Sequence, residues 1–243
     1  MRGDQHVAIS LCSAGLLLAP LSMSLEPAVI LLALLGVFIG SLAPDADARD
    51  AAIFHTRVHG VKGVKGQILN AFAVVLPIFG YTIRYLIYYP LSLLTMIVFR
   101  KIYSHQHRGL LHSFAGTAVM TLLLLAYLRA GLTLAGLQQD AALAVFGLSF
   151  LGGCLLHLLE DSCTPGGVAW LFPASRQRIS GRIQATGRFD PRPKGFAAVL
   201  AAGGAAVFAL QYAACLQLEG IILAVAAFIL LWIAFLATAR VQW

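Results

Sequence analysis

Residues 142–161 read ALAVFGLSFLGGCLLHLLED. The stretch is almost entirely apolar, and a helix needs about 20 such residues to cross a bilayer. It ends in His157 and Asp161, and ionisable groups beside hydrocarbon are costly, so they usually mark a functional site. Histidine and aspartate are also common metal ligands. The stretch therefore predicts a membrane helix that ends in a metal site.

The composition of the whole chain agrees with a membrane protein. Of its 243 residues, 60% are hydrophobic and 11% are charged, whereas soluble domains carry about 25% charged residues. The mean hydropathy is +0.85. The four cysteines form no Cys-x-x-Cys pair, so neither a disulfide framework nor a cysteine-based zinc site is expected. The net charge of +7 is interpreted as a topology signal, and no nucleic-acid partner is expected.

Six apolar stretches predict spanning helices, and one further apolar block has a different pattern. The six are 7–23, 27–43, 111–130, 142–160, 195–216 and 220–239. The block 68–99 is broken by Pro77 and Pro90, and each half has about 15 residues, which suits a re-entrant hairpin or two tilted segments. We therefore expect an all-α, polytopic membrane protein with about six transmembrane helices plus this hairpin.

The chain is expected to form a single membrane domain over 1–243. The motifs that carry candidate chemistry lie within 1–190, and the two C-terminal spans in 195–239 carry none.

The distribution of basic residues predicts the orientation in the membrane. With six spans and a returning hairpin, one side of the membrane holds the N-terminus and the regions 44–67, 100–110, 161–194 and 240–243. All of the 17 Lys and Arg residues except Arg84 and Arg129 lie on that side, as do all seven histidines. The positive-inside rule places this side in the cytoplasm. We expect a prokaryotic inner-membrane protein whose site faces the cytoplasm, unless 68–99 crosses an odd number of times.

Two pairs of residues have the type and spacing of metal ligands. His157 and Asp161 are four residues apart, so both lie on one face of a helix. His107 and His112 are five apart, about 140° around an ideal helix. We therefore expect His107 in the preceding loop and His112 in the first turns of the next helix. The plainer interpretations are an interfacial helix end for the first pair and a positive-inside flank for the second.

Two carboxylates and an early histidine are further candidates. Asp45 and Asp47 follow Pro44 at the end of the second span and are a plausible ligand pair for a divalent ion. The alternative is a solvated turn or a helix cap. His6 opens the first span on the same side of the membrane. The remaining histidines are treated as bystanders: His55, His59 and His105.

Three arginines are candidates for binding an anionic substrate. Arg108 stands beside His107, and its guanidinium group matches phosphate oxygens in a fork. Arg176 and Arg178 begin a basic segment that follows the predicted helix end at Asp161. Positive-inside retention and attraction of anionic lipids explain a basic segment equally well.

The order of these motifs resembles a known family. The chain has His6, then Pro44-Asp45-Ala46-Asp47, then His107-Arg108-Gly109-Leu110-Leu111-His112-Ser113, then His157-Leu158-Leu159-Glu160-Asp161-Ser162-Cys163-Thr164-Pro165-Gly166-Gly167 with a following Pro173. Over residues 1–190 this resembles the YdjM-like family of inner-membrane proteins, which are regarded as metal-dependent hydrolases. The resemblance implies a site made of His6, Asp45, Asp47, His107, His112, His157 and Asp161. The family is loosely similar to the all-α zinc phospholipase C and P1 nuclease group, which points to phosphoester hydrolysis by analogy of fold.

These observations predict a membrane-embedded metal-dependent hydrolase of a lipid or lipid-linked phosphoester. The expected cofactor is one or two divalent ions, Zn²⁺ first and Mn²⁺ or Mg²⁺ as alternatives, which would activate water. Asp47 is the expected proton acceptor. Arg108, with Arg176 or Arg178, would neutralise a phosphoryl oxygen. Membrane lipids are the expected partners.

Two other classes of function remain open at this point. A transporter for metal ions or protons also needs intramembrane Asp and His residues. It should carry polar residues deep in its spans, whereas the middles of 111–130, 142–160 and 220–239 are nearly free of them. A non-catalytic membrane adaptor would hold a structural metal with no open coordination position.

Overall fold

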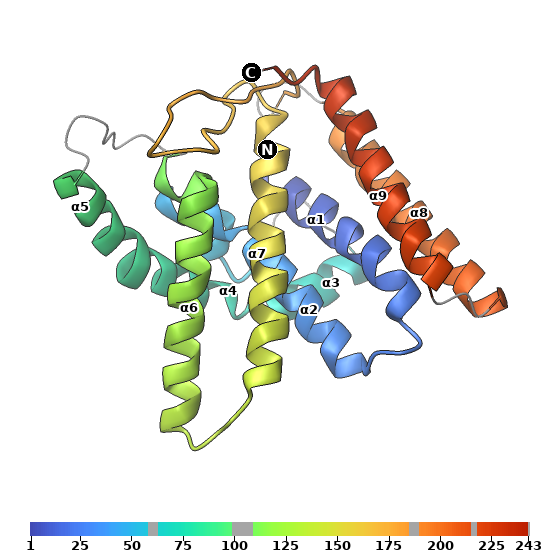
Figure 1. The fold of residues 1–243 in the computed structure, drawn as a ribbon, viewed down its shortest axis with the longest axis horizontal. Helices are drawn as coiled ribbons and strands as arrows, with labels where there is room; N and C mark the ends of the chain where they lie inside the picture. The colour runs from blue at the N-terminus through green and yellow to red at the C-terminus, as the bar shows by residue number, and fades with distance from the viewer. Residues whose placement is uncertain (58–62, 99–108, 185–189, 215–217, 243) are drawn as a thin grey trace.

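The chain folds into a helical bundle with a loop across one end (Figure 1). The computed structural model describes residues 1–57, 63–98, 109–184, 190–214 and 218–242. Among these residues, six helices are long and apolar enough to cross a membrane. They are Gly3–Leu21, Leu69–Val98, Phe114–Leu134, Asp140–Ser162, Arg192–Ala213 and Leu218–Ala239. The predicted all-α, polytopic membrane fold is therefore confirmed.

The described residues form α-helices and shorter helical segments in the following order. The α-helices are α1 (Gly3–Leu18), α2 (Pro27–Gly40), α3 (Gly63–Ala73), α4 (Leu76–Tyr81), α5 (Tyr89–Val98), α6 (Phe114–Leu134), α7 (Asp140–Ser162), α8 (Arg192–Ala214) and α9 (Leu218–Ala239). Short 3₁₀ segments are η1 (Ala19–Leu21), η2 (Ala43–Asp47), η3 (Ala52–Phe54) and η5 (Leu110–His112), and η4 (Thr82–Tyr88) is a π-helix.

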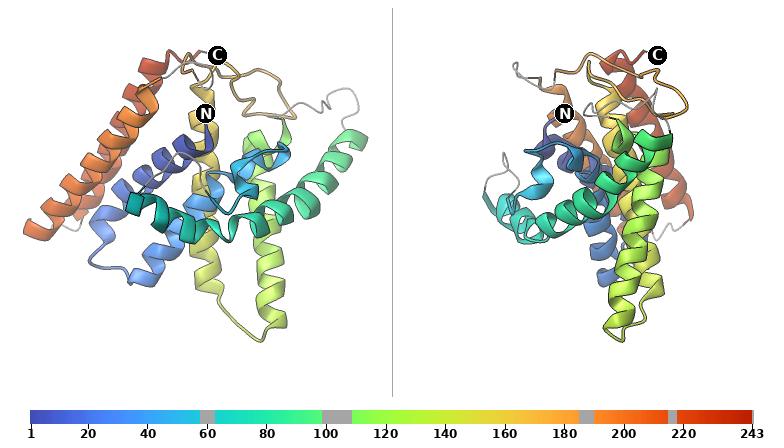
Figure 2. Two further views of the ribbon diagram at one scale, coloured as in Figure 1. Left: turned by 180° about the vertical axis from the view of Figure 1, so that it is seen from behind. Right: turned by 90° about the vertical axis from the view of Figure 1, so that its left-hand side faces the viewer.

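The block 68–99 is tilted and does not double back. The elements α3, α4, η4 and α5 follow one another closely, and Figure 2 shows them bowed across one side of the bundle. Pro77 lies in the first turn of α4, where its missing N–H costs no helical hydrogen bond. Leu69–Val98 is instead one continuous, tilted run of 30 residues that is long and apolar enough to cross a membrane, which corrects the expected re-entrant hairpin or pair of tilted segments.

α2 and α7 pack with their backbones in contact. A Cβ atom at Gly40 would overlap the carbonyl oxygen of Phe150, and one at Gly153 would overlap that of Val37. Small residues at such positions let membrane helices approach closely. α2 has 14 residues and ends earlier than the span predicted at 27–43. This close contact brings the residues that follow α2 beside the last turns of α7.

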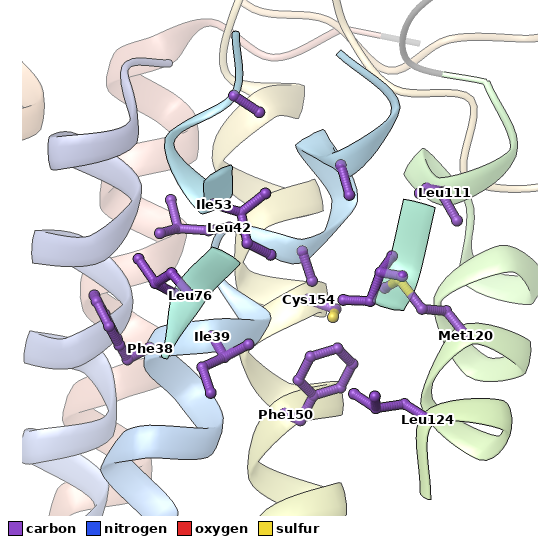
Figure 3. Packing of buried hydrophobic residues seen from close by; sticks show 14 of the residues in the cluster. Phe38, Ile39, Leu42, Ile53, Leu76, Leu111, Met120, Leu124, Phe150 and Cys154 are labelled. Carbon is purple, nitrogen blue, oxygen red and sulfur yellow. The ribbon is translucent and has the colours of Figure 1, made fainter. Parts of the chain in front are cut away.

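Two clusters of buried apolar side chains fix the positions of the helices. The first joins α2, η2, η3, the tilted helices, α6 and α7 (Figure 3), and it includes Phe38, Ile39, Leu42, Ile53, Leu76, Leu111, Met120, Leu124, Phe150 and Cys154. The second joins α1, α8 and α9, and it includes Ile9, Leu16, Phe196, Leu200, Trp232 and Phe235. Because the side chains of a core are close-packed and hardly compressible, these clusters fix the positions of the helices relative to one another.

The loop after α7 covers the end of the bundle at which α7 finishes (Figure 1). The Trp170 carbonyl accepts from the Phe114 N–H at 2.9 Å, and Ser180 pairs with Gln242 through the backbone. The Trp170 indole N–H donates to the Ser162 hydroxyl at 2.8 Å. The loop is therefore attached to the start of α6, the end of α7 and the C-terminal residues.

Candidate metal centre

Histidine and aspartate side chains from four separate segments meet below the covering loop. They are His6 in α1, Asp45 and Asp47 in η2, His112 at the end of η5, and His157 and Asp161 in the last turns of α7. The three histidines are fully buried. The structure therefore brings together six of the seven residues of the predicted site, and the seventh, His107, lies outside the described residues.

His157 is the centre of this cluster. Its Nδ1 lies 2.7 Å from the carbonyl oxygen of Ser41. Because a carbonyl can only accept, Nδ1 carries the proton and Nε2 keeps its lone pair. That Nε2 faces Nε2 of His112 at 3.4 Å and Oδ1 of Asp45 at 3.6 Å. A backbone acceptor on one ring nitrogen, with the other nitrogen facing further donor atoms, is the usual arrangement of a metal-binding histidine.

Three donor atoms form a triangle of the size that a metal ion requires. Asp45 Oδ1 lies 3.4 Å from His112 Nε2 and 3.6 Å from His157 Nε2, and the two nitrogens are 3.4 Å apart. Two ligands that bind one tetrahedral zinc ion at about 2.0–2.2 Å lie about 3.3–3.5 Å from each other. The spacing of these three atoms therefore fits a shared cation.

Asp161 and His6 extend the cluster toward α1. Asp161 Oδ2 lies 3.8 Å from Nε2 of both His112 and His157, and its Oδ1 lies 3.5 Å from Nε2 of His6. The His6 ring stacks on the His157 ring with centroids 4.0 Å apart. His6 Nε2 is buried and forms no close hydrogen bond among the described residues. Because it faces the Asp161 carboxylate, as the other two histidines do, this nitrogen also fits a site that holds a cation.

Two overlapping sets of donors result from this arrangement. In each set the ligand atoms lie within 4.8 Å of one another, and the sets are His6 with Asp45 and His157, and His112 with His157 and Asp161. Both sets contain His157, whose Nδ1 is already occupied by Ser41. Any ion bound by either set therefore depends on the same nitrogen, His157 Nε2.

Glu160 holds His6, a role that the sequence analysis did not assign. Glu160 Oε2 lies 2.6 Å from His6 Nδ1, and the Ser10 hydroxyl donates to Glu160 Oε1 at 2.9 Å. All three side chains are buried. A carboxylate on one ring nitrogen fixes the tautomer and aims the other nitrogen at the metal. Ser10 follows His6 by four residues on the same helix face, so comparing the faces of the two helices could have suggested this group.

Carboxylates flank His112 on both ring nitrogens. Asp45 Oδ1 lies beside Nε2, whereas Asp47 Oδ2 lies 3.9 Å from Nδ1, behind the ring. The position of Asp47 therefore suits orienting His112 better than binding the same ion. The next residue, Ser113, is the N-cap of α6, and its Oγ accepts from Gly116 N–H at 3.0 Å. The cap leaves His112 in η5, just before α6, which corrects its predicted position in the first turns of that helix.

Asp45 is the most accessible of the aspartates in the cluster. Its side chain is 21% exposed, against 3% for Asp47 and 1% for Asp161. Burial by itself would raise the pKa of the Asp45 carboxyl, but the imidazoles of His157 and His112 beside it hold that pKa well below its usual range. Asp45 is therefore an anion at neutral pH, as a carboxylate ligand must be. Of the aspartates in the cluster, Asp45 is also the one most open to solvent.

Two of the three arginines predicted to bind phosphate, Arg176 and Arg178, lie on the covering loop. Arg178 donates to the Gly166 carbonyl at 3.0 Å, and the side chain of Arg176 is exposed. Their assignment to a substrate phosphate stays a prediction. Outside the described residues lie His59, His105, His107 and Arg108.

Comparison with known proteins gives one match. Residues 1–242 match the model of a family described as YdjM inner membrane protein. No curated protein matches the chain, and no solved structure matches it. The family match extends past the motif-bearing part at 1–190, so it includes the last two spans. The family description gives a membrane location and names no reaction.

Proposed function

The chain belongs to the YdjM inner membrane protein family, and from its candidate metal centre we propose that it is a membrane-embedded, metal-dependent hydrolase. The observation that carries the proposal is the triangle of Asp45 Oδ1, His112 Nε2 and His157 Nε2, whose sides are 3.4, 3.4 and 3.6 Å. The substrate that fits the location is a lipid or lipid-linked phosphoester, because it arrives along the bilayer in which the helices lie.

The donor set favours Zn²⁺. Imidazole nitrogens together with carboxylates suit zinc, whereas Mg²⁺ prefers a shell of oxygen atoms, and Mn²⁺ is the next candidate. When bound, such an ion supplies Lewis acidity, which lowers the pKa of water toward about 7 and polarises a phosphoryl group. The residues proposed to hold it are Asp45, His112, His157 and Asp161, with His6 and His107 as further ligands.

The remaining roles fall to groups next to the proposed ligands. Asp47 lies behind the His112 ring and is proposed to orient that ligand; its predicted role as proton acceptor stays a proposal that this position does not by itself support. Arg108 belongs to the same motif as His112 and is proposed to neutralise a phosphoryl oxygen. Arg176 or Arg178 of the covering loop would assist it.

Metal-dependent release of phosphate tests the proposal directly. The purified protein in nanodiscs, stripped with a chelator, is expected to hydrolyse phosphatidic acid or a polyprenyl diphosphate after Zn²⁺ is added back. It should act weakly on p-nitrophenyl phosphate, which lacks the lipid chain. Inorganic phosphate is measured with Zn²⁺, Mn²⁺ and Mg²⁺ in parallel. A protein that binds zinc and hydrolyses none of the three substrates would contradict the hydrolase assignment.

The second candidate function is a membrane adaptor with a structural metal. The observation that favours it is the complete burial of His6, His112 and His157, since structural zinc sites are closed and have four protein ligands. X-ray absorption of the zinc-loaded protein separates the two candidates. A shell that consists of protein ligands alone supports the adaptor, and a shell with a water oxygen supports the hydrolase.

The orientation of the site is proposed to be cytoplasmic. Asp50 and Gln184 are both exposed in the described structure and lie in regions that the charge distribution assigns to one side. In a cysteine-free background, Asp50→Cys and Gln184→Cys should both be protected from a membrane-impermeant maleimide in intact cells. Both should react in inside-out vesicles. Labelling of either position in intact cells would overturn this orientation.

A further inference from the structure

Arg84 is an unusual residue in its surroundings. It is the only Asp, Glu, Lys or Arg between residues 69 and 98, a stretch apolar enough to cross a membrane. An arginine within a membrane segment is costly and is normally paired or held by backbone carbonyls. The partners of Arg84 should therefore indicate its function.

Arg84 is held by the segment that carries the candidate ligands. Its Nε donates to the carbonyl oxygen of Ala46 at 2.8 Å, and its Nη2 donates to that of Ala48. Its Cζ lies 3.8 Å from the centroid of the Phe54 ring, a cation–π contact. One guanidinium group therefore joins two carbonyls at η2 and an aromatic ring of η3.

The two carbonyls belong to Ala46 and Ala48, the residues on either side of Asp47, and Ala46 directly follows Asp45. A carbonyl cannot change position by side-chain rotation, so a rigid guanidinium fork that binds both restrains the backbone between them. The Ala48 N–H donates to the Asp45 carbonyl at 2.9 Å and closes the same turn. The Asp45 side chain therefore starts from a restrained backbone, which limits where its carboxylate can lie.

The π-helix η4 is packed against the core and holds Arg84 beside this turn. The Tyr89 N–H donates to the Arg84 carbonyl in the widened helix, and π-bulges occur frequently at functional sites. Ile83 and Ile87 are fully buried in the cluster that contains Ala46. Three tyrosines in and next to η4 have exposed side chains, namely Tyr81, Tyr85 and Tyr89.

We infer that Arg84 is a positioning residue of the metal centre, which it serves by holding the Asp45–Asp47 turn in the conformation that directs Asp45 Oδ1 toward His112 and His157. The inference rests on the metal site of the proposed function, but not on hydrolysis. It means that the tilted helix and the ligand-bearing turn move as one unit.

The test compares three variants in the full-length protein in nanodiscs. Arg84→Met removes both donors and keeps the length of the side chain, and Arg84→Lys keeps the charge without the fork. Arg129→Met is the matched control, because Arg129 is exposed in α6 and pairs at 3.3 Å with Asp140, the first residue of α7. The measurements are the Zn²⁺ dissociation constant from chelator competition and hydrogen–deuterium exchange of residues 43–54 without metal.

Arg84→Met should weaken zinc binding by about 10–100-fold, the effect of losing an outer-shell partner. Exchange should rise at 43–54 and stay unchanged in α6 and α7. Arg84→Lys should be intermediate, and it replaces Arg84→Met in the comparison if that variant does not fold. Wild-type zinc affinity and wild-type exchange in the Arg84 variants would overturn the inference.

Failure of the proposed function gives a different result. A wild-type protein that binds no zinc would remove the metal site, whereas exchange at 43–54 would still report whether Arg84 holds the turn. A rise in exchange throughout the bundle would show a general loss of stability and would contradict a positioning role.

Discussion

Replacing His157 with alanine is expected to abolish zinc binding and any metal-dependent hydrolysis. The Nε2 atom of His157 is common to both sets of donors and to the triangle with Asp45 and His112. Its removal therefore takes one donor from each of these sets. We expect the zinc dissociation constant to rise by more than the roughly 100-fold effect of losing an outer-shell group. Zinc content by elemental analysis and phosphate release measure the two effects.

Two further variants make this result interpretable. His157→Gln fills more of the buried space than alanine and still lacks the imidazole lone pair, so it should lose zinc to the same extent. His55→Ala removes an exposed histidine close in sequence to the ligand-bearing turn and should keep wild-type zinc. A His157→Ala protein with wild-type zinc content would place the metal elsewhere in the chain.

Replacing Glu160 with alanine is expected to reduce both stability and metal affinity. Glu160 accepts from Ser10 at 2.9 Å and lies 2.6 Å from His6 Nδ1, and all three side chains are buried. Leaving these two partners unsatisfied should cost about 2–5 kcal/mol of unfolding free energy. Without the carboxylate, the His6 ring is no longer held with Nε2 toward the cluster, and zinc affinity should fall by about 10–100-fold. Unfolding in detergent and chelator competition give the two quantities.

The conservative variants separate the two effects of Glu160. Glu160→Gln keeps the shape and a hydrogen-bonding oxygen but loses the charge, so it should lose less stability while still weakening zinc binding. Ser10→Ala should cost about 1 kcal/mol and leave His6 in place. Glu219→Gln, at an exposed position at the start of α9, is the control. Zinc affinity in Glu160→Gln equal to that of the wild type would mean that the carboxylate does not orient His6.

The membrane fold and the meeting of the ligand candidates could be expected from the sequence. Long apolar stretches are strong signals, and the ligand candidates stand at span ends that a count of crossings assigns to one side. His157 and Asp161 are related by helical spacing alone, and the structure brings His6, Asp45 and His112 to them.

The groups that support these side chains were harder to predict. The acceptor for His157 Nδ1 is the Ser41 carbonyl, and a backbone atom has no signature in the sequence. In the sequence, Arg84 stood out only as an exception to the charge distribution. Its contact with Ala46 could not be predicted, because it depends on how the tilted helix crosses the bundle. Glu160 was visible within a motif, but its partner His6 lies 154 residues away in the chain.

The glycine contact between α2 and α7 has a consequence for genetic studies of this protein. Ser41, whose carbonyl holds His157, directly follows α2, and a Cβ atom at Gly153 would lie 2.9 Å from the Ser41 nitrogen. A single methyl group at Gly153 would therefore tilt the imidazole without touching any ligand. A Gly153 variant of this kind would bind less metal and would be mistaken for the loss of a ligand, although the substitution changes only the packing of two helices. The neighbouring Gly152, where a Cβ atom would meet nothing within 4 Å, would tolerate the same methyl group.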